Sequence, residues 1–207
     1  MSNCVIIGGA DINNYERVKS FLHRDDYFIY CDSGLKHLDN LGFKPSLIVG
    51  DFDSHENPNM DIETIVLPRA KDDTDTVYAA REGIKRGFES FVLIGVTGGR
   101  IDHTLGNIYL LLYLYDNGKK AVMIDEYSEL SIIGTEPEHI SDKYPYFSLV
   151  NIEGTAKGIT IENAKFPLTD GEITTRYQYG FSNEVLPGKK AKVYTKEGTL
   201  LLIKDII

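Results

Sequence analysis

Two aspartates, Asp51 and Asp53, lie two residues apart in segment 49–54, directly after a short apolar run. Carboxylates at this spacing on a turn can converge on one hard cation, and Mg²⁺ takes one or two carboxylates together with substrate phosphates. Like charges this close repel each other, so they need a metal ion, a hydrogen-bond donor or a proton between them. A solvated acidic turn is the alternative, but Gly50 and Ser54 favour a close backbone approach to a ligand.

A second acidic turn, residues 71–76, reads Lys-Asp-Asp-Thr-Asp-Thr. Helix capping and the favourable charge of carboxylates near a helix N-terminus account for Asp72 or Asp73 together with Thr74. Capping does not require three carboxylates. A third metal carboxylate from this turn could therefore complete the cation site, and Lys71 could face a phosphate.

A glycine-rich turn with one arginine, residues 95–104, reads Gly-Val-Thr-Gly-Gly-Arg-Ile-Asp-His-Thr and joins an apolar run to a helical pattern. Exposed backbone N–H groups and the helix dipole make such a turn an anion site. Arg100 adds a bidentate phosphate donor. Asp102 is expected to cap the helix, and His103 is a candidate phosphate donor or base. The turn follows neither the Walker A pattern nor G-x-G-x-x-G.

Asp32 follows another apolar run, in the sequence Cys-Asp-Ser-Gly at 31–34. It is either a helix-capping or turn residue or a further acidic residue of the same site. No serine or cysteine nucleophile motif accompanies these turns. Acidic turns combined with a glycine–arginine turn point to phosphoryl or diphosphoryl transfer, in which a protein chiefly positions groups and neutralises charge.

Strands must position these turns, because the turns follow short apolar runs that alternate with helical patterns. The expected strands are residues 5–9, 27–31, 47–49, 63–67, 91–96 and 121–124. The expected helices are residues 15–23, 34–41, 74–86 and 103–117. This alternation predicts an α/β domain with a parallel sheet and helices on both faces. Ligands bind at the carboxyl ends of the strands in such sheets.

After residue 126 the pattern changes to short strands separated by turns. The candidate strands are residues 130–133, 146–151, 158–164, 190–195 and 199–203. Their spacing predicts an antiparallel β-sandwich or barrel. We therefore expect two domains, residues 1–126 and 127–207, and a homodimer that covers part of the small β-domain.

Charge and composition exclude several classes of protein. The chain has 22 basic and 31 acidic side chains, a net charge of -9, which argues against nucleic-acid binding. No apolar run approaches a membrane span, and we expect no signal peptide. Cys4 and Cys31 lie in apolar runs and are expected to be buried, reduced thiols of a cytoplasmic protein.

Four motifs together resemble those of the thiamine pyrophosphokinases. They are Cys-Asp-Ser-Gly at 31–34, Gly-Asp-Phe-Asp-Ser at 50–54, Asp-Asp-Thr-Asp at 72–75 and Gly-Gly-Arg-Ile-Asp-His-Thr-Leu at 98–105. Residues 180–184, Gly-Phe-Ser-Asn-Glu, are similar to part of the thiamine-binding β-domain of that family. The resemblance covers nearly the whole chain, and the second and fourth motifs are specific in combination.

The resemblance implies an enzyme that converts thiamine and ATP to thiamine diphosphate and AMP. It implies a homodimer in which an ATP- and metal-binding α/β domain is followed by a thiamine-binding β-sandwich, with sites between subunits. The implied residues are Asp51, Asp53 and Asp75 for Mg²⁺; Asp32 and Asp72 near the phosphates; Gly98, Gly99, Arg100, Asp102 and His103 on the nucleotide side; and Ser182 and Asn183 near thiamine.

Some family members place a tryptophan beside the thiamine ring, but this chain has none, so Phe181 or Tyr179 would stack there instead. Some members also carry a polar amide where this chain has Lys71. The thiamine hydroxyl is expected to attack the β-phosphorus of ATP in line, and Asp72 is our candidate for the group that accepts its proton.

Two other functions agree with the same residues. A related diphosphokinase acting on another hydroxymethyl heterocycle, such as a pterin, would share the first domain but differ in the β-domain pocket. A non-catalytic thiamine- or nucleotide-binding sensor would bind ligands without releasing AMP. The number of acidic residues argues against the sensor, because binding alone needs fewer metal carboxylates.

Overall fold

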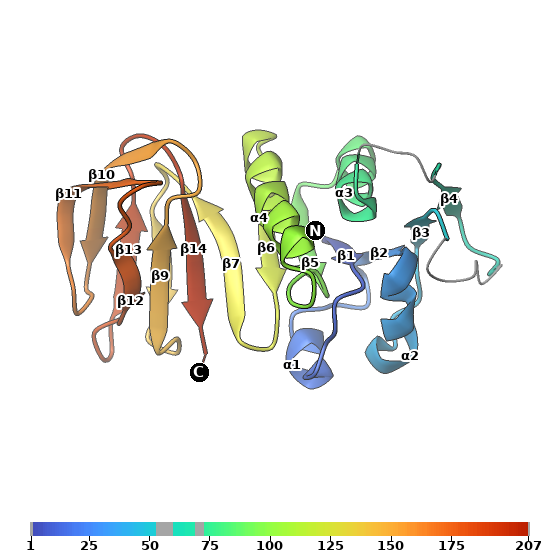
Figure 1. Ribbon diagram of the computed structural model, residues 1–207. Helices are drawn as coiled ribbons and strands as arrows, with labels where there is room; N and C mark the ends of the chain where they lie inside the picture. Colours follow the sequence, from blue (N-terminus) through green and yellow to red (C-terminus); the bar gives the residue numbers. More distant parts are fainter. Residues whose placement is uncertain (1, 53–59, 69–72, 207) are drawn as a thin grey trace. The chain divides into compact units, whose positions relative to one another are not determined.

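Six short apolar segments of the amino-terminal unit, Met1–Glu126, form a parallel sheet (Figure 1). The computed structural model describes residues 2–52, 60–68 and 73–206. Across the sheet the strands follow the order β6-β5-β1-β2-β3-β4, and each neighbouring pair is parallel. Their bounds are β1 (Cys4–Ile7), β2 (Tyr27–Cys31), β3 (Leu47–Gly50), β4 (Thr64–Val66), β5 (Ser90–Ile94) and β6 (Lys120–Ile124).

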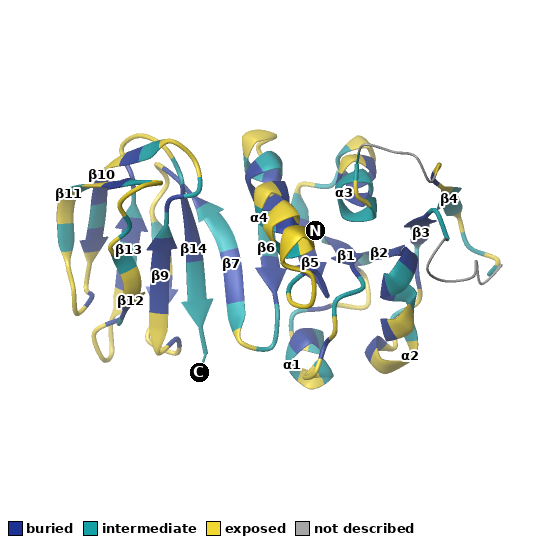
Figure 2. Cartoon of the chain, viewed as in Figure 1, coloured by how far each residue is buried: buried dark blue, intermediate teal, exposed yellow. Residues whose placement is uncertain are grey.

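Helical segments cover both faces of this sheet. Ile7 of β1 joins a core that includes Val18 and Leu41, whereas Cys4 of the same strand faces Gly83, where an added Cβ would lie 2.9 Å from the Cys4 sulfur. Burial on both faces explains why the strands read as continuous apolar runs, and Figure 2 shows β1, β2, β3 and β5 almost wholly buried. The segments are α1 (Tyr15–Lys19), η1 (Asp32–His37), α2 (Leu38–Leu41), α3 (Asp75–Lys85) and α4 (Ile101–Asp116).

The segment after β2 differs from the helix expected over 34–41. It forms the 3₁₀ helix η1 followed by one turn of α-helix, α2. At Gly34 an added Cβ would lie 2.2 Å from the carbonyl oxygen of Ile7. Only glycine allows η1 to approach the end of β1 this closely. The close approach brings the residues after β1 and β2 together.

The carboxy-terminal unit, Tyr127–Ile207, consists of two antiparallel sheets. One sheet contains β12-β9-β14-β7 and the other contains β11-β10-β13-β8. The bounds are β7 (Ser128–Ile133), β8 (Glu138–Ser141), β9 (Tyr146–Val150), β10 (Thr155–Glu162), β11 (Leu168–Thr174), β12 (Gly180–Asn183), β13 (Lys190–Tyr194) and β14 (Leu200–Asp205).

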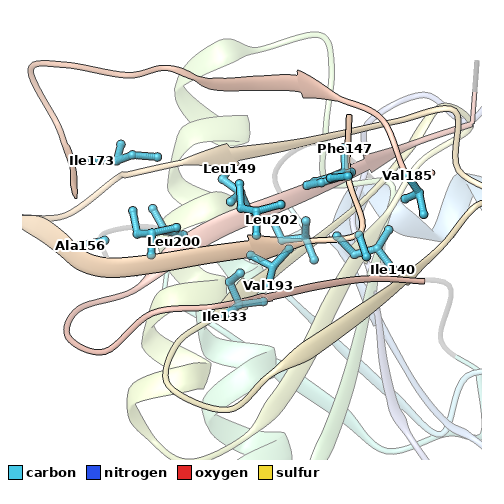
Figure 3. Close-up of a cluster of buried hydrophobic side chains, with 14 of the residues drawn as sticks. Ile133, Ile140, Phe147, Leu149, Ala156, Ile173, Val185, Val193, Leu200 and Leu202 are labelled. Carbon is cyan, nitrogen blue, oxygen red and sulfur yellow. The ribbon is translucent and has the colours of Figure 1, made fainter. Parts of the chain in front are cut away.

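Both sheets of this unit contribute to one buried cluster, shown in Figure 3. Phe147 of β9 and Leu202 of β14 come from the first sheet. Ile140 of β8 and Val193 of β13 come from the second. The shared core is the arrangement of two packed antiparallel sheets that the strand spacing predicts.

Three strands of this unit were not expected from the sequence: β8, β11 and β12. Each stands at the end of its sheet's strand order within this unit. A strand with one neighbour is only partly covered, so its apolar pattern is weak. β12 also begins at Gly180, where an added Cβ would lie 2.4 Å from the carbonyl oxygen of Leu149.

The helices described in the structure are all too short or too polar to cross a membrane.

Candidate functional site

The carboxyl ends of β1, β2 and β5 border a cavity of about 480 Å³. Its walls come from the turns after these three strands and from the first turns of α3 and α4. The cavity lies at the edge of the sheet where the sequence analysis expects ligands to bind. Of the predicted site residues, those that line it together are Asp75, Gly98, Gly99, Arg100 and His103.

The glycine-rich turn of the cavity, defined as residues 95–99, requires its glycines for backbone conformation. Gly95, Gly98 and Gly99 have φ angles of 61°, 87° and 62°, values that side-chain-bearing residues rarely adopt. At Gly98 and Gly99, nothing in the described part of the chain lies within 4 Å of an added Cβ. There is therefore room beside the left-handed backbone at these two positions, and the N–H of Gly98 donates to Oγ1 of Thr104 at 3.1 Å.

Arg100, which lines the cavity, forms an ion pair with Asp102. Nη2 of Arg100 lies 2.5 Å from Oδ2 of Asp102, and Nε lies 3.2 Å from Oδ1. The hydrogen bond from Arg100 lowers the pKa of the Asp102 carboxyl. Both side chains are more than half exposed, so the pair contributes little to stability. The guanidinium can exchange this carboxylate for another anion.

Asp102 does not cap α4, contrary to the sequence prediction. The N-cap is Arg100, and Asp102 lies within the first turn of the helix. Its Oδ1 accepts a hydrogen bond of 3.0 Å from the backbone N–H of His103. The carboxylate still lies near the positive end of the helix dipole, but the pairing with Arg100 rather than capping fixes its orientation.

Asp32 and Asp51 follow neighbouring strands of the sheet. Cys31 of β2 is paired with Val49 of β3, and Asp32 is buried beside Gly50. An added Cβ at Gly50 would lie 2.7 Å from the Cβ of Asp32, so Gly50 is needed for this approach.

Asp51 leads into an unusual backbone conformation. The next residue, Phe52, has a φ of 54°, an uncommon value for a residue with a bulky side chain. Asp53, Lys71 and Asp72 lie outside the described residues. Asp75 is the first residue of α3 and follows the N-cap Thr74, whose side chain accepts a hydrogen bond from the N–H of Val77.

Ser182 and Asn183 differ in what their side chains can do. Asn183 is buried, and its amide donates to the carbonyl oxygen of Phe166 at 2.8 Å and accepts from the N–H groups of Phe166 and Glu184. These bonds join β12 to the segment around residue 166. Ser182 is exposed, has a φ of 52°, and donates its N–H to the hydroxyl oxygen of Ser148. Asn183 therefore shapes the backbone, and Ser182 faces solvent.

A second, smaller cavity of about 130 Å³ lies within the carboxy-terminal unit. Phe166, Tyr179 and Phe181 line it, together with Leu168 and Asn183. The three aromatic rings are each more than 40% exposed. A small cavity with exposed rings is suited to a flat or cationic heterocycle.

Two family models match this chain. The model described as thiamin pyrophosphokinase, catalytic domain, matches residues 18–123, and that described as thiamin pyrophosphokinase, vitamin B1 binding domain, matches residues 132–200. The chain belongs to the thiamin pyrophosphokinase family. The resemblance found in the four motifs is confirmed.

Individual members of the thiamin pyrophosphokinase family agree with this assignment. The thiamine pyrophosphokinase of Bacillus subtilis (strain 168) is 26% identical over 213 residues, with 99% of both chains covered. A solved structure of thiamin pyrophosphokinase from Geobacillus thermodenitrificans is 27% identical, with a TM-score of 0.83 and coverage of 98% of this chain and 96% of that one. The solved structure of thiamine pyrophosphokinase from Bacillus subtilis has a TM-score of 0.88 at 23% identity, with 99% of both chains covered, and therefore shows the same fold.

Among the polar residues that line the first cavity of this family member, Asp11, Lys36, Thr76 and Asn107 were not predicted as site residues from the sequence. Lys36 pairs with Asp11 at 2.7 Å. A lysine on a short helix carries no signal that separates it from a solvated surface residue. Asn107 did carry a signal in the sequence, because it is a polar residue directly before the apolar run 108–114. In the structure it is buried.

Proposed function

We propose that this chain transfers the diphosphate group of ATP to the hydroxyl of thiamine, giving thiamine diphosphate and AMP. The observation that carries the proposal is the first cavity, in which a left-handed glycine turn, Arg100 and Asp75 meet at the carboxyl edge of a parallel sheet. Membership of the thiamin pyrophosphokinase family supports both the reaction and the two substrates.

The phosphates of ATP would bind against the glycine-rich turn and the start of α4. Gly98 and Gly99 leave room beside the turn, since no side chain or backbone atom described lies within 4 Å of an added Cβ, and the positive end of the α4 dipole favours an anion. Arg100, exposed and held by Asp102, would exchange that carboxylate for two phosphate oxygens, because a guanidinium matches such oxygens in a bidentate way. His103 would donate a further hydrogen bond.

The acidic side chains at the same edge fit a magnesium ion in chemical type. Asp51 and Asp75 offer carboxylate oxygens, the ligands that Mg²⁺ prefers, and both follow the carboxyl ends of strands or begin the next helix. Asp53 would be the third ligand. When bound, the ion would offset negative charge on the phosphates. Asp32, which is buried beside Gly50, would be a further acidic side chain near the phosphates.

In the chemical step the hydroxyl oxygen of thiamine would attack the β-phosphorus of ATP. A bond forms between that oxygen and the β-phosphorus, the bond from the β-phosphorus to the oxygen bridging to the α-phosphate breaks, and AMP leaves with the electron pair. The hydroxyl proton would pass to a carboxylate, for which Asp72 is our candidate. Arg100 would stabilise charge on the transferred group.

Thiamine would use the aromatic rings of the second cavity. Its thiazolium ring carries a positive charge, which is attracted to the faces of aromatic rings. Support comes from Phe166, Tyr179 and Phe181, which line that cavity, and they would replace the absent tryptophan. The exposed Ser182 would offer a hydrogen bond, whereas Asn183 would hold the surrounding backbone through its bonds to Phe166.

We also propose that the protein acts as a homodimer in the cytoplasm. Ile101, Leu105 and Tyr109 are 78%, 52% and 55% exposed along α4. Their spacing of four residues places them on one side of the helix, and a second copy of the chain could cover this apolar stripe.

The state of the cysteines supports the cytoplasm as the compartment. Cys4 and Cys31 are buried, and burial raises the pKa of the Cys4 thiol to about 12, which suits an unreactive thiol in a reducing compartment.

The experiment that tests the reaction measures nucleotide products from ATP and Mg²⁺, with thiamine, with a hydroxymethyl pterin, and with neither. AMP that appears only with thiamine, beside a product heavier by one diphosphate, supports the proposal. AMP formed only with the pterin would move the activity to that alcohol. Binding of ATP without any AMP would indicate a sensor.

A further inference from the structure

A chain of hydrogen bonds passes through the buried side chain of Asn107, which lies on α4. Its Nδ2 is 2.9 Å from the carbonyl oxygen of Val96, just after β5. Its Oδ1 is 2.7 Å from Oγ1 of Thr76, in the first turn of α3. Oγ1 of Thr76 is in turn 3.0 Å from Oγ1 of Thr74, the N-cap of α3. The chain therefore connects the ends of three elements that border the first cavity.

The donors and acceptors in this chain can be assigned without ambiguity. The carbonyl oxygen of Val96 can only accept, so the amide nitrogen of Asn107 must face it and Oδ1 must face Thr76. Thr76 then donates its single hydroxyl proton to Asn107. Thr74 must therefore donate to Thr76, and its own oxygen accepts from the N–H of Val77 at 3.4 Å. Each hydrogen bond in this series therefore has one donor and one acceptor, from Thr74 through Thr76 and Asn107 to Val96.

The series of hydrogen bonds ends at two residues, Val96 and Thr74, that adjoin parts of the proposed site. Val96 belongs to the glycine-rich turn, which lines the first cavity and is the proposed phosphate site. Thr74 directly precedes Asp75, a proposed metal ligand. Asn107 is 6% exposed, and a polar side chain is retained at such depth only when its hydrogen bonds are made. Its amide sets the separation between the start of α3 and the turn.

We propose that Asn107 and Thr76 are positioning residues, which hold the Asp75 end of α3 at a fixed distance from the glycine-rich turn so that metal and phosphate are bound together. This inference rests on the proposed function, because it takes Asp75 as a metal ligand. Residues that orient metal ligands typically change metal affinity by 10–100-fold when they are replaced. The link between Thr76 and Asn107 is the one that can be cut without disturbing the bond from Asn107 to Val96.

The test compares Thr76→Val with Thr76→Ser. Valine has the shape of threonine without the hydroxyl, whereas serine keeps the hydroxyl and loses only a methyl group. Affinity for Mn²⁺ alone is measured by electron paramagnetic resonance of the unbound ion, with no nucleotide or thiamine present. The thermal unfolding midpoint of each variant is recorded alongside. Thr76→Ala gives the same comparison if the valine variant does not unfold cooperatively.

We expect Thr76→Val to bind Mn²⁺ about tenfold more weakly than the original chain, and Thr76→Ser to recover most of the affinity, with unfolding midpoints within a few degrees. Equal Mn²⁺ affinity in the valine variant, equal losses in both variants, or no binding by the original chain would each overturn the inference. Thiamine-dependent AMP release is measured on the same samples. If the original chain releases no AMP, but Thr76→Val still binds Mn²⁺ more weakly than Thr76→Ser, the proposed function is overturned and the positioning role is not.

Discussion

Asp32 and Gly50 meet at the ends of two neighbouring strands, so closely that a Cβ at Gly50 would lie 2.7 Å from the Cβ of Asp32. The contact joins a buried carboxylate to the residue directly before Asp51. Gly50 therefore sets how near the two acidic side chains of this edge can come to each other.

Replacing Gly50 by alanine should push Asp32 away from residue 50. The new methyl group overlaps the Asp32 side chain and backbone, and overpacking of this kind typically costs about 1–3 kcal/mol of stability. We expect a lower unfolding midpoint and weaker Mn²⁺ binding. Gly106→Ala is the matched control, because nothing described lies within 4 Å of its added Cβ and alanine favours a helix by up to about 1 kcal/mol. A Gly50→Ala protein as stable as Gly106→Ala would contradict this account.

His37 should make the stability of the chain depend on pH. Its Nε2 lies 2.8 Å from the carbonyl oxygen of Ala10 and its Nδ1 lies 2.7 Å from the hydroxyl of Tyr15. Since a carbonyl only accepts, Nε2 carries the proton and Nδ1 accepts from Tyr15, which a neutral ring satisfies. Burial lowers the pKa of His37, and the charge of Lys36 lowers it further, while the bond to Ala10 and the charge of Asp11 oppose this.

A histidine whose pKa is lowered by folding binds a proton more readily in the unfolded chain. The free energy of unfolding should therefore fall as pH drops below the ordinary histidine value of about 6.5, by at most about 1.4 kcal/mol per pH unit. Urea unfolding at pH 7.5 and pH 5.5 checks this. His37→Gln should reduce the difference between the two pH values, and His139→Gln, at an exposed position, should not. Equal pH dependence in the His37 variant and the original chain would contradict the prediction.

Lys36 should contribute to ATP binding. Its Nζ lies 2.7 Å from Oδ1 of Asp11, and both residues line the first cavity. Because Asp11 is largely exposed, the pair contributes little to stability, and a phosphate could replace it. We expect Lys36→Met to raise KM for ATP about tenfold, the loss of roughly 1.4 kcal/mol, with kcat and the unfolding midpoint little changed. Lys19→Met, which removes a pair with Glu16 on α1, should leave KM unchanged.

Phe181 should affect thiamine and not ATP. Its ring is 55% exposed and lines the second cavity, so little stability depends on it. We expect Phe181→Ala to raise KM for thiamine about tenfold, in the range of a cation–π contact of roughly 1–2 kcal/mol, with KM for ATP unchanged. Tyr146→Ala, which removes another exposed ring of this unit, is the control. Equal effects of Phe181→Ala and Tyr146→Ala on KM for thiamine would show that the Phe181 ring does not bind thiamine.

The sequence was most informative where strands are buried on both faces. The runs at β1, β2, β3 and β5 are apolar throughout because helices cover both sides of the sheet, and the polar turns that follow them stand out by contrast. Gly98 and Arg100 could be expected at one ligand-binding edge from this pattern, whereas Asp75 was singled out by the family resemblance, and all three line the first cavity. β8, β11 and β12 could not be predicted, because a strand with one neighbour has a weaker apolar pattern.

Other features depend on contacts between distant residues. Asn107 and Thr76 are 31 positions apart, and nothing in either local sequence indicates that their side chains meet at 2.7 Å. The 3₁₀ turns of η1 follow from the approach of Gly34 to β1. Tertiary packing decides both the contact between Asn107 and Thr76 and the form of η1.

The central claim is that a diphosphate group, and not a single phosphate, moves from ATP to thiamine. The most direct measurement uses ATP labelled with ³²P at either the β- or the γ-phosphate, with Mg²⁺ and thiamine, and follows each label by chromatography. We predict that both labels enter the same thiamine product and that the AMP is unlabelled. A γ-label transferred without the β-label, with labelled ADP formed from the β-labelled ATP, would contradict the proposed reaction.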